Sequence, residues 1–538
     1  MRSAIFVCLP ALALLCVTGC SKNAERPGAA PDSLRIAIPI SPTQLNPILS
    51  QNTIETFADG LVFNFLVTHD QNRRQIPDLA ATVPSLANGG ISKDGMTLTY
   101  HLRRGVKWQD GAPFTSRDIK FSWQAIMNPR NNVVSRRGFD QIASMDTPDD
   151  YTVVMHMKRL FPPAVDSIFA ESDTPTTVLP AHLLAKYSDL NHVPFNAAPI
   201  GTGPYEFVRW QRGDRIVFRA NPGYFRGAPA IKDLTLAIIP DDNTTQAQLQ
   251  THEANLGIEI TSSVYRDLGG APGVVRQLAE SPSFTAIIFN TNRAPLDDLR
   301  VRRALVLGMD RAAIVRDDTY GTGRLAVADL APFYWAFDSS LQPAPYDPAQ
   351  AKALLDAAGW HSGPDGVRVR DGKRLSLLLV YGLGSQTVHT ITAQVQQMYR
   401  AVGVDVELKG FDYAMLYAAA QSGGILNAGK FDLAMYAWVS GSDPDDSSAW
   451  TCKMIPPAGN NVSRYCSPEM EAAQRLALST FDQSLRKRAY AKIESLLLRD
   501  APAAFIYYQS LRYARGADLQ NFEPNGISEG WNAQDWRR

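Results

Sequence analysis

Few residues in this sequence stand at the spacings that catalytic chemistry requires. The zinc motif His-Glu-x-x-His and the phosphate-binding motif Gly-x-x-x-x-Gly-Lys-Ser/Thr are absent, and no two of the eight histidines are four residues apart. Neighbouring carboxylates such as Asp297-Asp298 and Asp445-Asp446 have the chemistry of an acid–base pair, but helix caps and solvated turns are their commoner role. We therefore predict no catalytic residue, no metal site and no cofactor, although a site assembled from distant positions would leave no local motif.

The N-terminal cysteine predicts a lipid anchor. Residues 1–20 comprise Met-Arg-Ser, an apolar run over 4–17 and Thr18-Gly19-Cys20, which is the pattern of a secretory signal. Residues 17–20 resemble a bacterial lipobox, in which Cys20 is lipidated after residues 1–19 are removed. An ordinary signal peptide is the alternative. We expect an extracytoplasmic protein that is held to a bacterial membrane by the lipid on Cys20, with residues 20–32 as a flexible tether.

Two further cysteines, Cys452 and Cys466, remain in the mature chain. An even pair in an oxidising compartment predicts a disulfide, which would close a short loop and stabilise the fold by roughly 3 kcal/mol. A zinc site is the competing interpretation, but neither a Cys-x-x-Cys step nor a nearby histidine supports it.

Composition excludes one class of partner. The 538 residues include 53 basic and 53 acidic side chains, so a nucleic-acid partner is not expected. The apolar share of 45% is typical of a soluble globular protein, and the length predicts two to four domains.

The elements that position any site change in character along the chain. Alternating apolar residues predict strands over 33–40, 97–103 and 151–158, in antiparallel sheets with one solvated face. Later segments predict a buried strand over 285–290, a helix over 297–317, and a helix over 346–360 that Asp347 caps and Gly359 ends. A strand over 375–381, a helix over 386–402 and a strand over 404–408 form a βαβ unit with parallel strands, and 431–439 is another buried strand.

Several segments together resemble the extracytoplasmic solute-binding proteins of peptide ABC transporters. The most specific is 92–119, with Leu102-Arg103-x-Gly105-Val106, Asp110-Gly111 and a helix capped around Thr115. Further matches, in the family's order, are Leu45-Asn46-Pro47, Pro77-Asp78-Leu79-Ala80, Gly201-Thr202-Gly203-Pro204-Tyr205, Asn221-Pro222-x-Tyr224, Phe289-Asn290-Thr291, Val301-Arg302-Arg303-Ala304 and Tyr346-Asp347-Pro348.

The resemblance implies a mixed α/β fold of two lobes joined by a hinge, with an extra β-rich insert domain. We expect a discontinuous lobe I over 33–65, 195–275 and 500–538, an insert over 66–194 and lobe II over 276–499. The family's members bind peptides between the lobes and deliver them to ABC permease subunits that work with a cytoplasmic ATPase. We expect a monomer of this kind, without catalysis.

The resemblance also locates a ligand site. Residues 436–445 are similar to the family's Trp-x-x-Asp…Asp-Pro stretch, which implies that Trp438, Val439, Ser440, Gly441 and Asp443 lie in the cleft, although Trp438 also suits a core position. Gln51, Asn52 and Thr53 fall where the family pairs its main chain with the ligand.

The stretch departs from the family at one position. Gly441 stands where peptide binders carry an amine-binding Asp, and Asp443 is the candidate substitute. A blocked peptide, an oligosaccharide and a metal chelate therefore remain alternative ligands, and a secreted hydrolase and a ligand sensor remain alternative functions.

Overall fold

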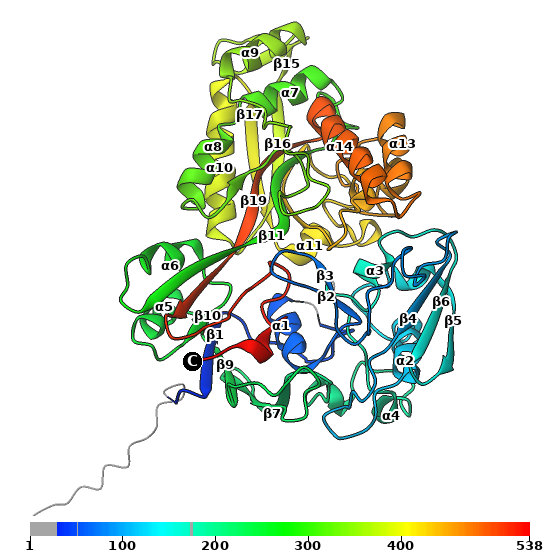
Figure 1. Cartoon of the computed structure of the whole chain (residues 1–538). Helices are drawn as coiled ribbons and strands as arrows, with labels where there is room; N and C mark the ends of the chain where they lie inside the picture. The colour runs from blue at the N-terminus through cyan, green and yellow to red at the C-terminus, as the bar shows by residue number, and fades with distance from the viewer. Residues whose placement is uncertain (1–29, 51, 173–175) are drawn as a thin grey trace, which may run out of the picture.

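A long mixed sheet runs through the molecule and joins its parts (Figure 1). The computed structural model describes residues 30–50, 52–172 and 176–538. Among these residues the sheet has eleven strands, in the order β17-β16-β18-β11-β19-β10-β1-β9-β8-β7 with β12 beside β19. They are β1 Ser33–Ile38, β7 Tyr205–Gln211, β8 Arg215–Ala220, β9 Asp233–Ile238, β10 Leu256–Gly257, β11 Val274–Phe289, β12 Arg324–Leu325, β16 Ser376–Gly382, β17 Asp405–Phe411, β18 Leu433–Val439 and β19 Ala503–Gly516.

Two of these strands, β11 and β19, pass from one lobe to the other (Figure 1). Their antiparallel pairing is irregular at the crossing, because Glu280 pairs with Ser510 whereas Phe284 pairs with Tyr508. The extra residues on β11 form a bulge, and bulges bend a strand and increase its twist. The paired strands therefore change direction between the lobes, and this crossing is the hinge of the molecule.

Lobe I surrounds the parallel strands β9, β1 and β10. Its helices are α1 Thr53–Val62, α5 Asp242–Gln250 and α6 Ser262–Asp267, and the C-terminal segment after β19 returns to it through Phe522 and Trp536. The predicted first strand is confirmed but ends at Ile38, so Ile40 lies outside it with 44% of its surface exposed.

The insert contains an antiparallel sheet in the order β4-β6-β5. Its strands are β4 Thr97–His101, β5 Ile142–Asp149 and β6 Thr152–Met157, with the pair β2 Val67–His69 and β3 Gln75–Pro77, and with helices α2 Ser116–Met127, α3 Ala164–Ser167 and α4 Ala181–Leu184. Alternate residues of β4 and β6 are buried, as predicted, and the Thr115/Asp118 capping box starts α2 where the sequence places a cap. The insert shares one continuous hydrophobic core with lobe I.

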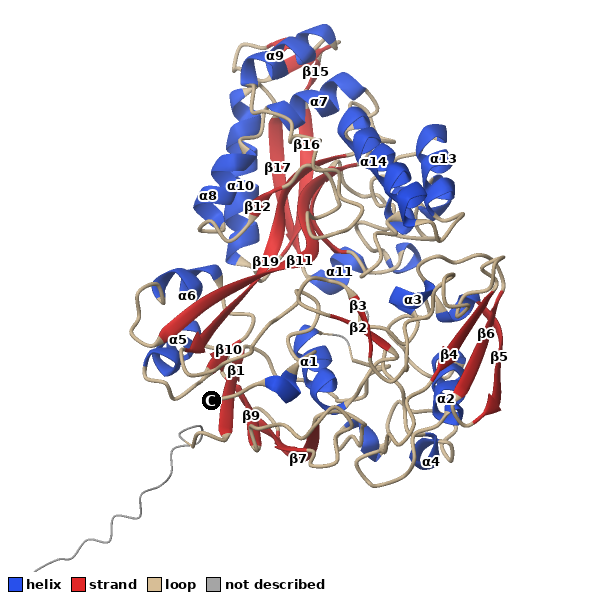
Figure 2. Ribbon diagram, in the orientation of Figure 1, coloured by secondary structure: helices blue, strands red, loops and turns tan. Residues whose placement is uncertain are grey.

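Lobe II places its sheet between two layers of helices (Figure 2). One layer comprises α7 Leu299–Leu307, α8 Arg311–Asp318, α9 Pro348–Ala357 and α10 Gln386–Ala401. The other includes α13 Pro468–Ala477 and α14 Gln483–Asp500, and the short helices are α11 Tyr413–Tyr417 and α12 Ser447–Trp450. A small sheet is formed by β13 His361–Ser362, β14 Arg368–Arg370 and β15 Lys373–Arg374.

The βαβ prediction is confirmed in lobe II. β16 and β17 are parallel with α10 between them in sequence, and α9 begins after Asp347 and is followed by Gly359 at φ +83°. The predicted helix over 297–317 is wrong in one respect, because it is two helices. α7 ends at Leu307, and the side chain of Asp310 accepts from the backbone N–H of Ala313, which starts α8 instead of continuing α7.

One predicted lobe boundary also differs from the structure. The prediction places residues 500–538 in lobe I, but Ala503, Phe505 and Tyr508 are buried in a lobe II core. The reason is that β19 crosses the hinge, so its first half belongs to one lobe and its second half to the other.

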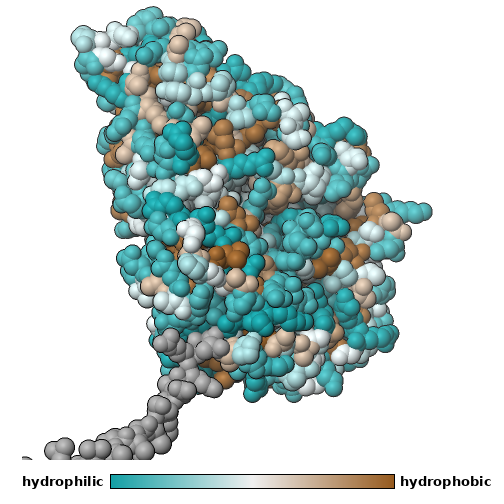
Figure 3. Space-filling view, turned by 60° about the vertical axis from the view of Figure 1, so that its left-hand side comes forward, coloured by the Kyte–Doolittle hydropathy of each residue, from teal (hydrophilic) through white to brown (hydrophobic). Residues whose placement is uncertain are grey.

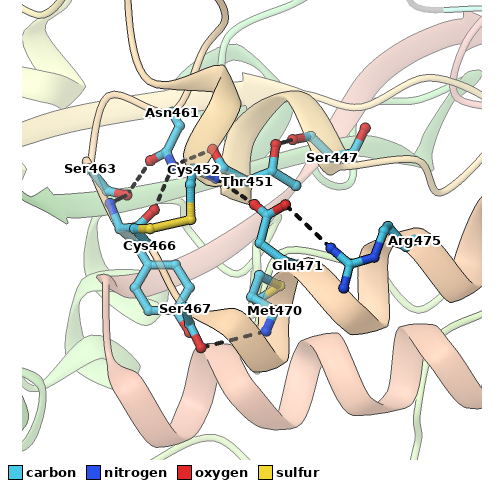
Figure 4. Close-up of a disulfide and its surroundings, with 11 residues drawn as sticks. Ser447, Thr451, Cys452, Asn461, Ser463, Cys466, Ser467, Met470, Glu471 and Arg475 are labelled. Carbon is cyan, nitrogen blue, oxygen red and sulfur yellow. Dashed lines mark hydrogen bonds and ion pairs between the residues drawn. A yellow bond between two sulfur atoms is a disulfide. The ribbon is translucent and has the colours of Figure 1, made fainter.

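Cys452 and Cys466 are joined by a disulfide in lobe II (Figure 4). Asn461 lies within the closed loop and its Nδ2 donates to the carbonyls of Thr451 and Tyr465 at 2.9 and 2.7 Å. Glu471 of α13 accepts from the Cys452 N–H at 2.7 Å. The disulfide thus fastens the chain after α12 to the start of α13.

The predicted signal, residues 1–19, and the predicted lipid site Cys20 lie outside the described residues, as does most of the tether. Across the described part of the chain, no helix combines the length and apolar character needed to span a bilayer. The face in Figure 3 is mainly hydrophilic, with hydrophobic residues in separate small patches.

Candidate ligand-binding site

A cavity of about 370 Å³ lies beside the hinge, where the parallel strands β16 and β18 end. Lobe II contributes most of its lining, including Gly382 and Tyr436, the hinge strands contribute Thr285 and Tyr507, and lobe I contributes Thr261 and Ser262. We call it the hinge cavity. Ligands of open α/β sheets bind outside the carboxyl ends of the strands, so this cavity is the candidate site.

Its lining is rich in groups that form hydrogen bonds. The hydroxyl side chains are Thr261, Ser262, Thr285, Thr319, Thr322, Ser385, Thr387 and Ser510, together with the tyrosines. The Gln509 amide, also in the lining, donates to Thr285 at 3.0 Å. Such a surface suits a ligand with many donors and acceptors, such as a peptide backbone.

A row of four aromatic rings begins in the cavity lining with Tyr413, Tyr417 and Tyr436 and ends outside the lining at Trp438. The ring centroids of Tyr413 and Tyr417 are 6.2 Å apart, those of Tyr417 and Tyr436 are 6.3 Å apart, and those of Tyr436 and Trp438 are 6.2 Å apart. Gly382 makes room for the row, because a Cβ at this position would lie 2.6 Å from the Tyr413 ring. Burial raises the pKa of Tyr417 to about 12, so its hydroxyl stays protonated at neutral pH.

The lining contains one carboxylate and one guanidinium. Asp318 ends α8 and accepts from the Gln394 amide at 3.2 Å, and burial raises its pKa. Arg512 lies on β19 and donates to the carbonyls of Ile260 and Ser510, both at 2.9 Å. The hinge cavity therefore offers charges of both signs.

A second cavity, of about 790 Å³, lies between the insert and lobe II, and we call it the insert cavity. Arg73 of the insert lies over the Phe333 ring of lobe II at 4.7 Å, and both line it. In the same cavity, Nε2 of His69 lies 3.0 Å from Oδ1 of Asp166. Burial opposes the imidazolium, but hydrogen bonds to Asp166 and Glu171 raise the pKa of His69 to about 9.

The chain that follows β18 contacts the insert and contributes Ser442 to the insert cavity. Ser442 donates to the Glu171 carbonyl at 2.6 Å, and Arg137 pairs with Asp445 at 2.8 Å. These contacts join lobe II to the insert.

The comparisons with known proteins agree with this geometry. The family model described as "Bacterial extracellular solute-binding proteins, family 5 Middle" matches residues 77–454. The chain belongs to this family. The predicted family and the predicted two-lobed fold are both confirmed, and family 5 proteins are extracytoplasmic solute-binding components of ABC importers that bind peptides or related ligands.

Relatives of this family 5 protein bind different solutes. The oligopeptide-binding protein AppA of Bacillus subtilis is 26% identical, over 92% of this chain and 89% of AppA. The glutathione-binding protein GsiB of Salmonella typhimurium is 27% identical, over 90% of this chain and 89% of GsiB. The structure of NikZ from Campylobacter jejuni with Ni(L-His) superimposes with a TM-score of 0.78 at 26% identity, covering 95% of this chain and 100% of NikZ.

Three of the candidate residues on this family 5 chain lie at the end of β18. Val439 is 51% exposed, and Trp438 is half-buried, with one side against the lobe II core and its ring stacked on Tyr436. Ser440 donates its N–H to the Pro282 carbonyl at the hinge, at 2.8 Å.

The next two candidates contact other protein groups. The Gly441 carbonyl accepts from the Tyr334 hydroxyl at 2.5 Å. Asp443 is 4% exposed and forms an ion pair with Arg486 at 2.6 Å. Burial raises the pKa of Asp443, and the Arg486 guanidinium opposes this effect. Its ion pair with Arg486 makes Asp443 a poor partner for a ligand amine.

The N-terminal candidates lie in lobe I. Gln51 is outside the described residues. Asn52 caps α1 by accepting from the Glu55 N–H at 2.9 Å, which gives it a structural role. Thr53 donates to Glu259, which is two residues from Thr261 in the cavity lining.

The candidate acid–base pairs have structural partners. Asp298 caps α7, and Asp446 accepts from the Gln474 amide at 2.7 Å. Among the described residues, no group of three or more His, Cys, Asp or Glu side chains could hold a metal ion. Residues 526–530 have the Gly-x-Ser-x-Gly spacing of a serine nucleophile, which sequence reasoning missed, but they lie in a loop and not in the strand-to-helix turn that this motif needs.

Sequence reasoning also missed Tyr413, Tyr417, Tyr507, Asp318 and Arg512 of the hinge cavity. One signal was available, because Tyr413 and Tyr417 are four residues apart and directly follow the β17 strand. The others converge only when β19 crosses the hinge and α8 ends beside it.

Proposed function

We propose that this protein binds short peptides between its lobes and delivers them to the permease of an ABC importer. The observation that carries this proposal is a free strand edge beside the hinge cavity. β18 pairs with β11 along its whole length, but only Leu433 and Ala434 pair with β16. Within the described residues, no strand pairs with the other edge of residues 435–439.

A free edge of this kind is suited to a ligand in extended conformation. Added strands gain affinity through main-chain hydrogen bonds, while pockets receive alternate side chains. Tyr436 and Ala437 belong both to the free edge and to the cavity lining, so a peptide paired with β18 would lie in the cavity. The cavity volume is at the low end of the ~300–1,000 Å³ typical of ligand sites, which favours short peptides.

The names of the relatives support the same ligand class. AppA is an oligopeptide-binding protein and GsiB is a glutathione-binding protein. A metal chelate is the second candidate, because NikZ was crystallised with Ni(L-His). An oligosaccharide is the third, because the aromatic row offers flat faces on which a ring could stack.

The proposal extends to the cell envelope. We propose that residues 1–19 are a signal, that Cys20 carries the lipid anchor and that the mature protein acts as a monomer with permease subunits and a cytoplasmic ATPase. The spacing of residues 17–20 and the extracellular family support this arrangement.

The test is ligand binding by the mature chain with Cys20 replaced by Ser. Native mass spectrometry of the protein from rich medium should show adducts that fragment as peptides, and titration calorimetry with a tripeptide pool should give saturable binding. A protein that ignores the pool but binds cellobiose or Ni(L-His) would refute the peptide proposal in favour of the corresponding alternative. Release of altered ligand would contradict a purely binding role.

A further inference from the structure

We infer that the positively charged amine of the ligand binds to Asp318 of lobe II, and not to the chain that follows β18. This inference rests on the proposed peptide-binding function and adds the residue that recognises the amine.

Asp318 is the only carboxylate in the described lining of the hinge cavity, and one of its oxygens is unused. Oδ1 accepts from Gln394 at 3.2 Å. Oδ2 is buried and has no hydrogen-bond partner, and no cation among the described residues forms an ion pair with Asp318. A buried carboxylate oxygen without a donor is costly, so a donor from the ligand would satisfy it.

The hydroxyl oxygens of Thr319 and Thr322 can accept hydrogen bonds from the same ammonium group of the ligand. Thr319 uses its hydroxyl proton on the Val315 carbonyl at 2.5 Å, and Thr322 uses its own on the Thr319 carbonyl at 2.7 Å. Both threonines line the cavity, and each hydroxyl oxygen keeps lone-pair capacity. This corner therefore combines a negative charge with acceptors, which fits the three N–H donors of a primary ammonium group.

Among the described residues, the chain after β18 contributes no carboxylate to the lining of the hinge cavity. Gly441 has no side chain, Asp443 is neutralised by Arg486, and Asp445 is neutralised by Arg137. Asp443 and Asp445 already have cationic partners, and Asp446 accepts from the Gln474 amide and does not line the hinge cavity, whereas Asp318 lines the cavity and has no cationic partner among the described residues.

The opposite charge of the cavity fits the other end of a peptide. Arg512 uses Nε and Nη1 on carbonyl groups, and its Nη2 forms no hydrogen bond with the described residues. Asp318 and Arg512 both line the cavity with Tyr507, and the described residues show no ion pair between them. A short peptide carries an ammonium and a carboxylate that match these two groups.

The experiment compares Asp318→Asn with Asp317→Asn, a matched control that removes the adjacent exposed carboxylate, which pairs with Arg316. The probes are a lysine-free pool of tripeptides and the same pool after N-acetylation, titrated into the mature chain. In the unmodified protein, acetylation should weaken binding at least tenfold. Asp318→Asn should weaken binding of the free-amine pool by a similar factor and leave the acetylated pool unchanged, and Asp317→Asn should change neither.

The outcomes separate this inference from the function on which it rests. Equal binding of both pools by the unmodified protein, or full affinity of Asp318→Asn for the free-amine pool, would overturn the role of Asp318 while peptide binding stands. Failure of the unmodified protein to bind either pool would overturn the proposed function, and the inference with it. If Asp318→Asn folds poorly, the comparison of the two pools on the unmodified protein still tests the inference, because equal binding of both pools would overturn it.

Discussion

Removing the disulfide should lower the stability of lobe II by an amount set by the loop that it closes. Cys452 and Cys466 are 14 residues apart, which makes a loop of 15 residues. The chain-entropy relation gives about 3 kcal/mol for such a loop at 25 °C. Because Cys466 is exposed and Cys452 is half-buried, serine at both positions adds little desolvation cost.

The native loop should persist without the sulfur bridge. The Asn461 bonds to Thr451 and Tyr465 and the Glu471 bond to Cys452 use backbone groups that serine retains (Figure 4). Removal of the cross-link therefore lowers the free energy of unfolding mainly because the unfolded chain gains conformations. For a unit of 150–250 residues, ~3 kcal/mol corresponds to a fall of about 6–12 °C in melting temperature.

The assay is calorimetric melting of the Cys452→Ser/Cys466→Ser variant and of the unmodified protein, each with and without reductant. Reductant should lower the melting temperature of the unmodified protein to that of the variant and should not affect the variant. Ligand affinity should change less than twofold, since neither cysteine lines a cavity of the described residues. Equal melting temperatures of the two proteins without reductant would refute the reasoning.

Three other substitutions test separate parts of the structure. Trp438→Ala removes the last ring of the aromatic row. We expect a ligand side chain to pack on this ring, and because aromatic contacts contribute ~0.5–1.5 kcal/mol, tripeptide binding should weaken by about 2–13-fold in calorimetry, whereas an unaltered Kd would remove Trp438 from the site. Asp443→Asn leaves the Arg486 charge buried without its partner. The free energy of unfolding measured in urea should therefore fall by about 3–5 kcal/mol, and a decrease below 1 kcal/mol would contradict the buried ion pair. Burial raises the pKa of Glu529 from 4.5 to about 7, so its contribution to stability is present below pH 4.5 and is lost as pH rises through 7. Glu529→Gln keeps an acceptor for the Tyr513 hydroxyl but does not titrate. Between pH 4.5 and 8, the free energy of unfolding of the variant should therefore fall by ~3 kcal/mol less than that of the unmodified protein. Parallel pH profiles of the two proteins would show that Glu529 does not titrate in this range.

Local sequence patterns predicted the elements of lobe II well. The cap at Asp347, the stop at Gly359 and the β16–α10–β17 unit depend on residues close together in the chain, and all three are present. The same reasoning wrongly predicted one continuous helix through residues 308–310. The helical spacing of apolar residues continues through this break, but the Asp310 side chain caps a new helix there.

Site residues were harder to predict because their roles depend on distant partners. The sequence marks Asp443 as a candidate for a ligand amine, but Arg486, 43 residues later, occupies it. It does not mark Asp318, whose importance comes from the donor that its Oδ2 lacks.

The sequence by itself determined the family and the class of fold, because these rest on short motifs in a fixed order. The tertiary structure decided which groups face the ligand. The bulge in β11 turns the paired strands between the lobes, β18 continues beyond its pairing with β16, and α8 brings Asp318 to the same cavity as Arg512 of β19. Residues nearly 200 positions apart become neighbours only through this packing, and no local pattern along the chain records it.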